Sequence, residues 1–279
     1  MDDVSGRAAG KGRERTLDAV DLRTPNVARM YDYLLGGKDN YAADREAVEE
    51  VVRRAPDTPF VARENRAFLG RGVRFLAESG IRQFVDIGSG LPTQGNVHEI
   101  AHQIAPDARV VYADVDPIVL THGRALLAGT PGVAVIQGDA RRVEDILAHP
   151  ELTKLIDLDQ PVAVLMLAVL HFIDDADDPP GIVARLRSAM APGSHLMISH
   201  VTADFDDDCR VREAGAVYEK ATSQITLRAR AEVERLFDGF DLVEPGLTTL
   251  SLWRPRPGST VPFGAERQWC YAGVGRRSG

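Results

Sequence analysis

From Arg82 onward, short apolar runs alternate with stretches of helical periodicity. The run at residues 162–170 is apolar without alternation, which is typical of a central strand covered on both faces. This pattern predicts an α/β fold of Rossmann-like, doubly wound type, in which crossover helices connect the strands of a mainly parallel sheet. Five such strands are predicted, near Phe84, Val110, Val133, Val162 and Leu196.

Two further strands are predicted at residues 241–243 and 269–274, with no clear helix between them. They would form an antiparallel pair at the edge and complete a seven-stranded sheet. The N-terminal third is helical, because Thr24-Pro25 and Thr58-Pro59 are helix-start signals and Gly36-Gly37 is a stop. The expected organisation is a mobile tail at 1–20, a helical cap at 21–80 and a sheet domain at 81–279.

Composition excludes several classes of protein. A chain of 279 residues with 44% hydrophobic content can bury a full core, and its net charge of -8 opposes binding to nucleic acid. No apolar run is long enough to cross a bilayer, and residues 1–15 lack a hydrophobic leader, so a cytoplasmic protein without membrane association is expected. Two isolated cysteines do not make a disulfide framework or a thiolate metal site. The sequence does not specify an oligomeric state.

A glycine-rich turn follows the first predicted strand, at residues 84–92. Gly88 and Gly90 suit a tight turn and close approach to a nucleotide, but Thr93 occupies the third glycine position of a dinucleotide motif. Asp86 just before the turn would repel a pyrophosphate and attract the ammonium and sulfonium of S-adenosylmethionine (SAM). The turn therefore favours SAM over NAD.

The order of motifs identifies a resemblance. Asp86-x-Gly88-x-Gly90 is followed by Asp114-Val115-Asp116-Pro117, by Gly138-Asp139-Ala140 and by a long apolar fourth strand, an order that resembles class I SAM-dependent methyltransferases. Residues 28–40 are similar to a bacterial family of S-adenosyl methyltransferases of unknown substrate, and the likeness runs from about residue 24 to residue 277. The resemblance implies an enzyme that uses SAM.

The resemblance also implies roles for individual residues. The turn glycines and Asp86 would hold the methionyl part of SAM, and Asp114 would accept the ribose hydroxyls. Asp139 would accept from the adenine amino group while the Ala140 N–H meets a ring nitrogen. A solvated turn explains Asp139 equally simply, and a helix cap explains Asp116. The cofactor-binding residues expected on this basis are Asp86, Gly88, Gly90, Asp114, Asp116, Asp139, Ala140 and Leu167.

His171 follows the fourth predicted strand, whose carboxyl end should face the ligand crevice. It is therefore a candidate general base. A lone histidine in this position is more often structural, however, and methyl transfer often needs only alignment of an acceptor that is already nucleophilic.

The break between the first two predicted helices combines aromatic and polar side chains, which suits an acceptor pocket. Ordinary helix packing around a loop is the alternative. The residues concerned are Tyr31, Tyr33, Lys38, Asn40 and Tyr41.

A rival function comes from His98-Glu99-Ile100-Ala101-His102, which satisfies the H-E-x-x-H pattern of zinc hydrolases. This helix must pack on the sheet, which would leave both histidines flanking or exposed, and no third ligand is evident, so no metal site is expected. A non-catalytic SAM-binding regulator is a further alternative. The favoured function is transfer of the SAM methyl group to an unidentified small-molecule acceptor.

Overall fold

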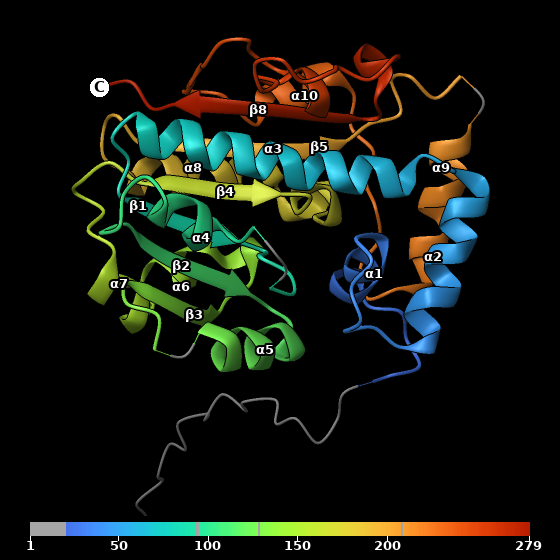
Figure 1. The fold of residues 1–279 in the computed structure, drawn as a ribbon, viewed down its shortest axis with the longest axis horizontal. Coiled ribbons are helices and arrows are strands. Elements are labelled where there is room, and N and C mark those ends of the chain that lie inside the picture. Colours follow the sequence, from blue (N-terminus) through green and yellow to red (C-terminus); the bar gives the residue numbers. More distant parts are fainter. Residues whose placement is uncertain (1–20, 93–94, 128, 208) are drawn as a thin grey trace, which may run out of the picture.

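The computed structural model describes residues 21–92, 95–127, 129–207 and 209–279. Its sheet has the strand order β3-β2-β1-β4-β5-β8-β6, with β7 paired to β8 (Figure 1). Strands β1 to β5 are parallel, and β8 runs antiparallel to β5. The strands are β1 Gln83–Ile87, β2 Arg109–Asp114, β3 Val133–Gln137, β4 Ala163–Leu167, β5 His195–Val201, β6 Asp241–Leu242, β7 Thr248–Thr249 and β8 Cys270–Arg276.

The doubly wound, mainly parallel fold is confirmed, and β4 is the buried central strand that its uniform apolar sequence predicts. The prediction of seven strands was wrong by one, because β7 adds a pair of threonines bridged to β8. Two residues are too short for any apolar periodicity, so the sequence carries no signal for this strand. The predicted late antiparallel pair is present as β6 and β8, with β8 inserted between β5 and β6.

Helices cover both faces of the sheet (Figure 1). Side chains alternate along the strands, so Phe84 and Leu165 enter one core cluster with α3 and α4. Val85 and Val164 enter the other, with α6, α7, α8 and α10. The helices are α1 Val27–Leu34, α2 Ala42–Arg54, α3 Thr58–Glu78, α4 Val97–His102, α5 Pro117–Leu127, α6 Val143–Leu147, α7 Pro150–Leu155, α8 Pro179–Ala189, α9 Arg210–Gly215 and α10 Arg230–Arg235.

The start of α1 differs from the prediction. Asn26, rather than Thr24, is the N-cap, and its side-chain oxygen accepts from the backbone N–H groups of Ala28 at 3.0 Å and Arg29 at 3.1 Å. Asparagine caps a helix as well as threonine does, and the Thr-Pro signal masked it. Helix α2 begins after Tyr41.

The helices of the predicted cap at residues 21–80 have two sets of packing partners. Helices α1 and α2 pack through Met30 and Val48 against Ala214 of α9 and the following Tyr218, so a distant segment completes the cap. Helix α3 contributes Ala62 to this cluster and also joins the sheet core through side chains such as Phe68. Apolar periodicity identifies a helix but not the surface it packs on, which is why the sequence missed this division. The predicted tail at 1–20 and Thr93 lie outside the described residues.

The cap lies beyond the carboxyl ends of β1, β2 and β4 (Figure 1). Strands β1 and β4 are neighbours although they are distant in sequence, which makes the gap between them the point where the winding of the sheet reverses. In open α/β sheets, ligands bind at the carboxyl ends of the strands at this point. The fold therefore places the glycine-rich turn after β1 in the expected ligand crevice.

Candidate functional site

The turn after β1 depends on its two glycines. Both have positive φ, +71° at Gly88 and +65° at Gly90, a region that residues with a side chain rarely adopt. A Cβ on Gly88 would also lie 2.4 Å from a methyl carbon of Val169, whereas a Cβ on Gly90 would meet no atom within 4 Å. Gly88 is needed for packing within the protein, while Gly90 leaves open space on the side where a ligand would approach.

Asp114, the last residue of β2, ties this turn to the next strand. Its carboxylate accepts hydrogen bonds from the backbone N–H groups of Gly90 and Asp116, each at 2.9 Å. The side chain is buried, and burial raises its pKa above the usual aspartate value, partly offset by these hydrogen bonds. Asp114 therefore stands beside the glycine turn.

Asp116 has two structural partners. One oxygen accepts from the N–H of Ile118 at 2.7 Å, which caps the start of α5, and the other accepts from the side-chain amide of Asn26. The predicted helix cap is therefore present. The contact with Asn26 joins the N-terminal helical segment to the sheet domain, directly beside Asp114.

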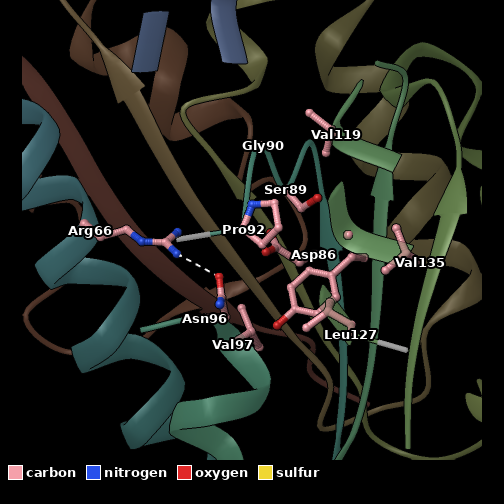
Figure 2. Close-up of a pocket in the computed structure, with 12 residues that line it drawn as sticks. Arg66, Asp86, Ser89, Gly90, Pro92, Asn96, Val97, Val119, Leu127 and Val135 are labelled. Atoms are coloured by element: carbon pink, nitrogen blue, oxygen red, sulfur yellow. Dashed lines mark hydrogen bonds between the residues drawn. The ribbon is translucent and has the colours of Figure 1, made fainter. Parts of the chain in front are cut away.

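Asp86 and Arg66 line the same small pocket, of about 20 Å³, next to the glycine turn (Figure 2). Asp86 is 5% exposed, and burial raises the pKa of its carboxyl to about 7, with Arg66 lowering it and Asp114 raising it. Arg66 reaches in from α3 and donates to the Asn96 side chain at 3.2 Å. Sequence reasoning missed Arg66, because an arginine within a helix carries no signal of what it faces.

The H-E-x-x-H pattern lies on α4, but its histidines have other partners. Nδ1 of His98 lies 2.7 Å from the Tyr112 hydroxyl, which also accepts from the His98 backbone N–H at 2.9 Å. Nε2 of His102 lies 2.9 Å from the Ala108 carbonyl oxygen. The expectation that both histidines would be flanking or exposed was wrong for His98, which is buried because Tyr112 projects from β2 beneath α4. Across the described residues, no three His, Cys, Asp or Glu side chains gather as a metal site.

Asp139 is held by Arg141 in this structure. The Arg141 guanidinium donates from Nε at 2.9 Å and from a terminal nitrogen at 2.6 Å, and its backbone N–H donates at 2.9 Å. Partial burial acts to raise the pKa of Asp139, but these contacts outweigh burial and the pKa is lowered. Asp139 thus caps the short 3-10 turn that begins at Ala140, the local role weighed against adenine binding.

Leu167 ends β4 and is almost buried, while His171 lies in the 3-10 turn that follows. The ring of His171 is 3% exposed and stands 4.4 Å from the Phe172 ring and 5.5 Å from the His200 ring, measured between centroids. Burial lowers its pKa well below the usual value, so the imidazole is neutral at pH 7. His171 is enclosed by these side chains, as in a packed core.

The five residues predicted to form an acceptor pocket do not gather in one place. Tyr31 donates its hydroxyl to the Ala62 carbonyl at 3.1 Å and accepts from Asn65, which makes it part of the contact between α1 and α3. The Asn40 side chain donates to Asp32 of α1 at 2.9 Å and to the Gly37 carbonyl at 3.1 Å, and Lys38 is exposed. Neighbours in a loop and on a short helix point in different directions, which explains why these side chains have different partners.

Tyr33 does line a groove, of about 620 Å³, between α1, α2 and the start of α3. Its floor is apolar, with Leu34, Val48 and Val52, and its rim carries Arg63. This volume falls in the range of small-molecule sites.

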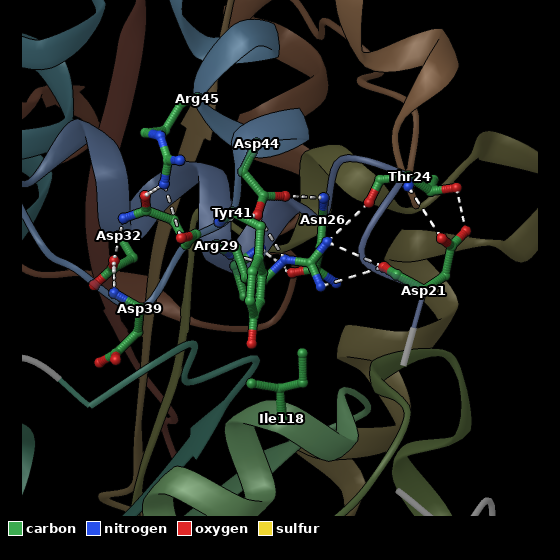
Figure 3. Close-up of polar contacts among 12 residues, drawn as sticks. Asp21, Thr24, Asn26, Arg29, Asp32, Asp39, Tyr41, Asp44, Arg45 and Ile118 are labelled. Carbon is green, nitrogen blue, oxygen red and sulfur yellow. Dashed lines mark hydrogen bonds and ion pairs between the residues drawn. The ribbon is translucent and has the colours of Figure 1, made fainter. Parts of the chain in front are cut away.

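A buried ion pair holds the start of α1 in place (Figure 3). Nε of Arg29 lies 2.8 Å from Oδ2 of Asp44, and both side chains are almost fully buried. The Asp44 carboxylate also accepts from the backbone N–H groups of Asn26 at 2.9 Å and Tyr41 at 2.8 Å. Arg29 also lies over the Tyr41 ring, which is directed toward Ile118 of α5. The network fixes the end of α1 that contacts Asp116.

Comparison with known proteins decides the family. Residues 13–278 match the sequence profile of a family described as S-adenosyl methyltransferase. The chain belongs to this family. It is a class I SAM-dependent methyltransferase, an enzyme whose cofactor is SAM, as its sequence motifs suggested.

Two solved structures resemble the methyltransferase over nearly its whole length. A DUF574 family protein from Streptomyces avermitilis is 42% identical with a TM-score of 0.88, and the alignment covers 92% of this chain and 99% of that one. A candidate methyltransferase from Thermobifida fusca is 42% identical with a TM-score of 0.87, and the alignment covers 93% of this chain and 97% of that one. None of the curated proteins matches this chain.

More distant structures share the fold alone. Human N-acetylserotonin methyltransferase, solved in complex with SAM, is 14% identical with a TM-score of 0.50, and the alignment covers 91% of this chain and 63% of that protein. Neither the family nor these structures support the zinc hydrolase or the non-catalytic regulator. Among the helices of the described residues, none has the length and apolar character needed to span a membrane.

Proposed function

We propose that this enzyme transfers the methyl group of SAM to a small-molecule acceptor, with SAM bound at the turn after β1. The observation that carries the proposal is the junction of Gly88, Gly90 and Asp114: two left-handed glycines and a buried carboxylate meet at the reversal point of the sheet. The open space at Gly90 and the opposite charges of Asp86 and Arg66 beside it suit a charged ligand.

The residues present fit the parts of the cofactor. Asp86, Gly88 and Gly90 would hold the methionyl part, and Asp114 the ribose hydroxyls. Asp139 and Ala140 would meet the adenine once Arg141 releases the carboxylate, with Leu167 closing the site from β4. Asp116 would act through its contact with Asn26, which joins the start of α1 to the start of α5 beside Asp114.

When bound, SAM would supply an electrophilic methyl group for in-line attack by the acceptor, with S-adenosylhomocysteine as the leaving group. The protein contributes alignment and the exclusion of water, so no serine or cysteine nucleophile is needed. His171 is neutral and enclosed, so proton removal by this residue would require Phe172 or His200 to move. We therefore assign His171 a packing role in preference to that of a general base.

The groove beside Tyr33 supports an acceptor of small-molecule size. Its apolar floor and the guanidinium of Arg63 would accommodate an apolar body with an anionic group. Replacing Val52 in the floor by Trp should raise the KM for the acceptor and leave SAM affinity unchanged. A variant with unchanged acceptor kinetics would exclude the groove.

Isothermal titration with SAM and S-adenosylhomocysteine tests the cofactor assignment. Both should bind the folded protein, and absence of binding by both would refute the proposal. Asp114→Ala should weaken both ligands about tenfold or more, the cost of one charge-assisted hydrogen-bond partner. Asp145→Ala is the matched control, because that aspartate of α6 is exposed and its ion-pair partner among the described residues is Arg142, which precedes the helix.

A further inference from the structure

Arg66 is a cation directed at the cofactor pocket that no sequence motif identifies. It projects from α3, which otherwise packs on the sheet, and its guanidinium reaches the pocket beside the glycine turn (Figure 2). One terminal nitrogen donates to Asn96 at 3.2 Å. Its Nε is buried and has no hydrogen-bond partner among the described residues. A buried donor without a partner is costly, so this one is suited to an incoming acceptor.

Asp86 lies in the same pocket with the opposite charge, yet the two side chains form no ion pair among the contacts of the described residues. A cation and an anion that line one pocket without contacting each other complement a ligand that carries both charges. The amino-acid end of SAM is such a group, because its ammonium and carboxylate are bonded to the same carbon.

We propose that Arg66 binds the carboxylate of the cofactor's amino-acid end, while Asp86 on the opposite wall binds its ammonium. The assignment rests on the proposed SAM site and adds a residue from outside the sheet motifs. Arginine suits this role because its planar donors match a carboxylate. Through Asn96, which precedes α4, Arg66 also lies against the segment that leaves the glycine turn.

The pocket should therefore distinguish cofactor forms by their carboxylate. Decarboxylated S-adenosylhomocysteine keeps the amine and the nucleoside but lacks the carboxylate. Wild-type protein should bind S-adenosylhomocysteine about tenfold to a hundredfold more tightly than this analogue, the range of one charged hydrogen-bond contact.

The test is titration calorimetry of both ligands with wild type, Arg66→Gln and Arg66→Lys. Arg66→Gln should reduce the ratio of the two affinities to near one by weakening S-adenosylhomocysteine alone, and Arg66→Lys should restore part of the ratio. Binding of the analogue at wild-type affinity shows that the variant is folded. Arg74→Gln is the matched control, because Arg74 is also on α3 and donates to an amide side chain, Gln103, at 3.3 Å.

Two outcomes would overturn the assignment. If Arg66→Gln keeps the wild-type ratio, the arginine does not contact the carboxylate. If the variant weakens both ligands equally, its role is structural. Failure of wild type to bind either ligand would instead refute the SAM site itself, so the two proposals are separable.

Discussion

Gly88 shows that the turn after β1 has no room for a Cβ at this position. Its φ of +71° and the 2.4 Å distance from a Cβ at this position to a Val169 methyl carbon both disfavour any other residue. Gly90 has a similar backbone conformation, but a Cβ there would meet no neighbouring atom. The two residues therefore separate two physical effects that usually occur together, backbone strain and steric overlap.

Gly88→Ala should lower the free energy of unfolding by about 2 to 4 kcal/mol, the sum of left-handed strain and overpacking. Gly90→Ala should cost about 1 kcal/mol, because strain alone applies. Urea denaturation of both variants measures the difference. Equal losses would mean that Val169 moves aside without cost.

Asp86 gives stability a pH dependence with a defined sign. Its carboxyl has a pKa of about 7 in the folded protein against a usual value of 3.8, so between these values the folded state binds more protons than the unfolded state. The contribution of Asp86 to unfolding free energy therefore falls as pH rises through this window. The charged groups acting on it are Arg66 from α3 and Asp114 from β2.

Asp86→Asn removes this contribution. Without cofactor, the unfolding free energy of the variant should rise relative to that of wild type by up to about 1.4 kcal/mol per pH unit, as pH rises between the two pKa values of Asp86. Denaturation midpoints at about pH 5 and about pH 7 would measure the change. A stability difference between the two proteins that is independent of pH would contradict it.

At the scale of elements, the buried pair of Arg29 and Asp44 joins α1 to α2. Besides pairing with Arg29, the Asp44 carboxylate accepts hydrogen bonds from the backbone N–H groups of Asn26 and Tyr41. Arg29 has additional partners in the carbonyls of Asp21 and Thr24. The two halves of the pair are therefore not equivalent.

Asp44→Leu should destabilise the protein by about 3 to 5 kcal/mol, because it leaves the buried guanidinium of Arg29 without its counter-charge and two backbone amides without an acceptor. Arg29→Met should lower the unfolding free energy by less, because the Asp44 carboxylate keeps its hydrogen bonds from the backbone N–H groups of Asn26 and Tyr41. Thermal unfolding of the two variants gives the order, and the reverse order would show that the cation dominates the network.

The helices were largely predictable from the sequence, and their partners were not. Apolar periodicity and glycine stops placed α1, α2 and α3 within a few residues. The same periodicity could not show that α3 packs on the sheet, or that α9 joins the cap. In the site, the glycines and Asp114 were predicted because strand ends are local features. Arg66 was missed because its approach to Asp86 depends on how α3 lies across the sheet.

At the scale of the whole molecule, the cap and sheet domain meet at the proposed cofactor site. Ala28 of α1 packs against Leu91, just after the glycine turn, and against Ile118 of α5. The Asn26 to Asp116 contact lies beside it. A ligand bound between the turn and Asp114 would therefore affect the packing of α1.

S-adenosylhomocysteine at about 100 times its Kd should raise the unfolding free energy by about 2.7 kcal/mol. Hydrogen exchange should slow in α1 more than in α7, which lies away from the turn on the opposite face. Uniform slowing in both helices would show that the ligand acts only through global stability.

The sequence alone determined the α/β fold, the glycine turn and the carboxylate that ends β2, because each follows from local periodicity or from a backbone conformation open to glycine. Only the tertiary structure decided which side chains surround the turn. It directed Arg66 toward Asp86, engaged His98 with Tyr112 and enclosed His171, since these contacts depend on packing between elements far apart in the chain.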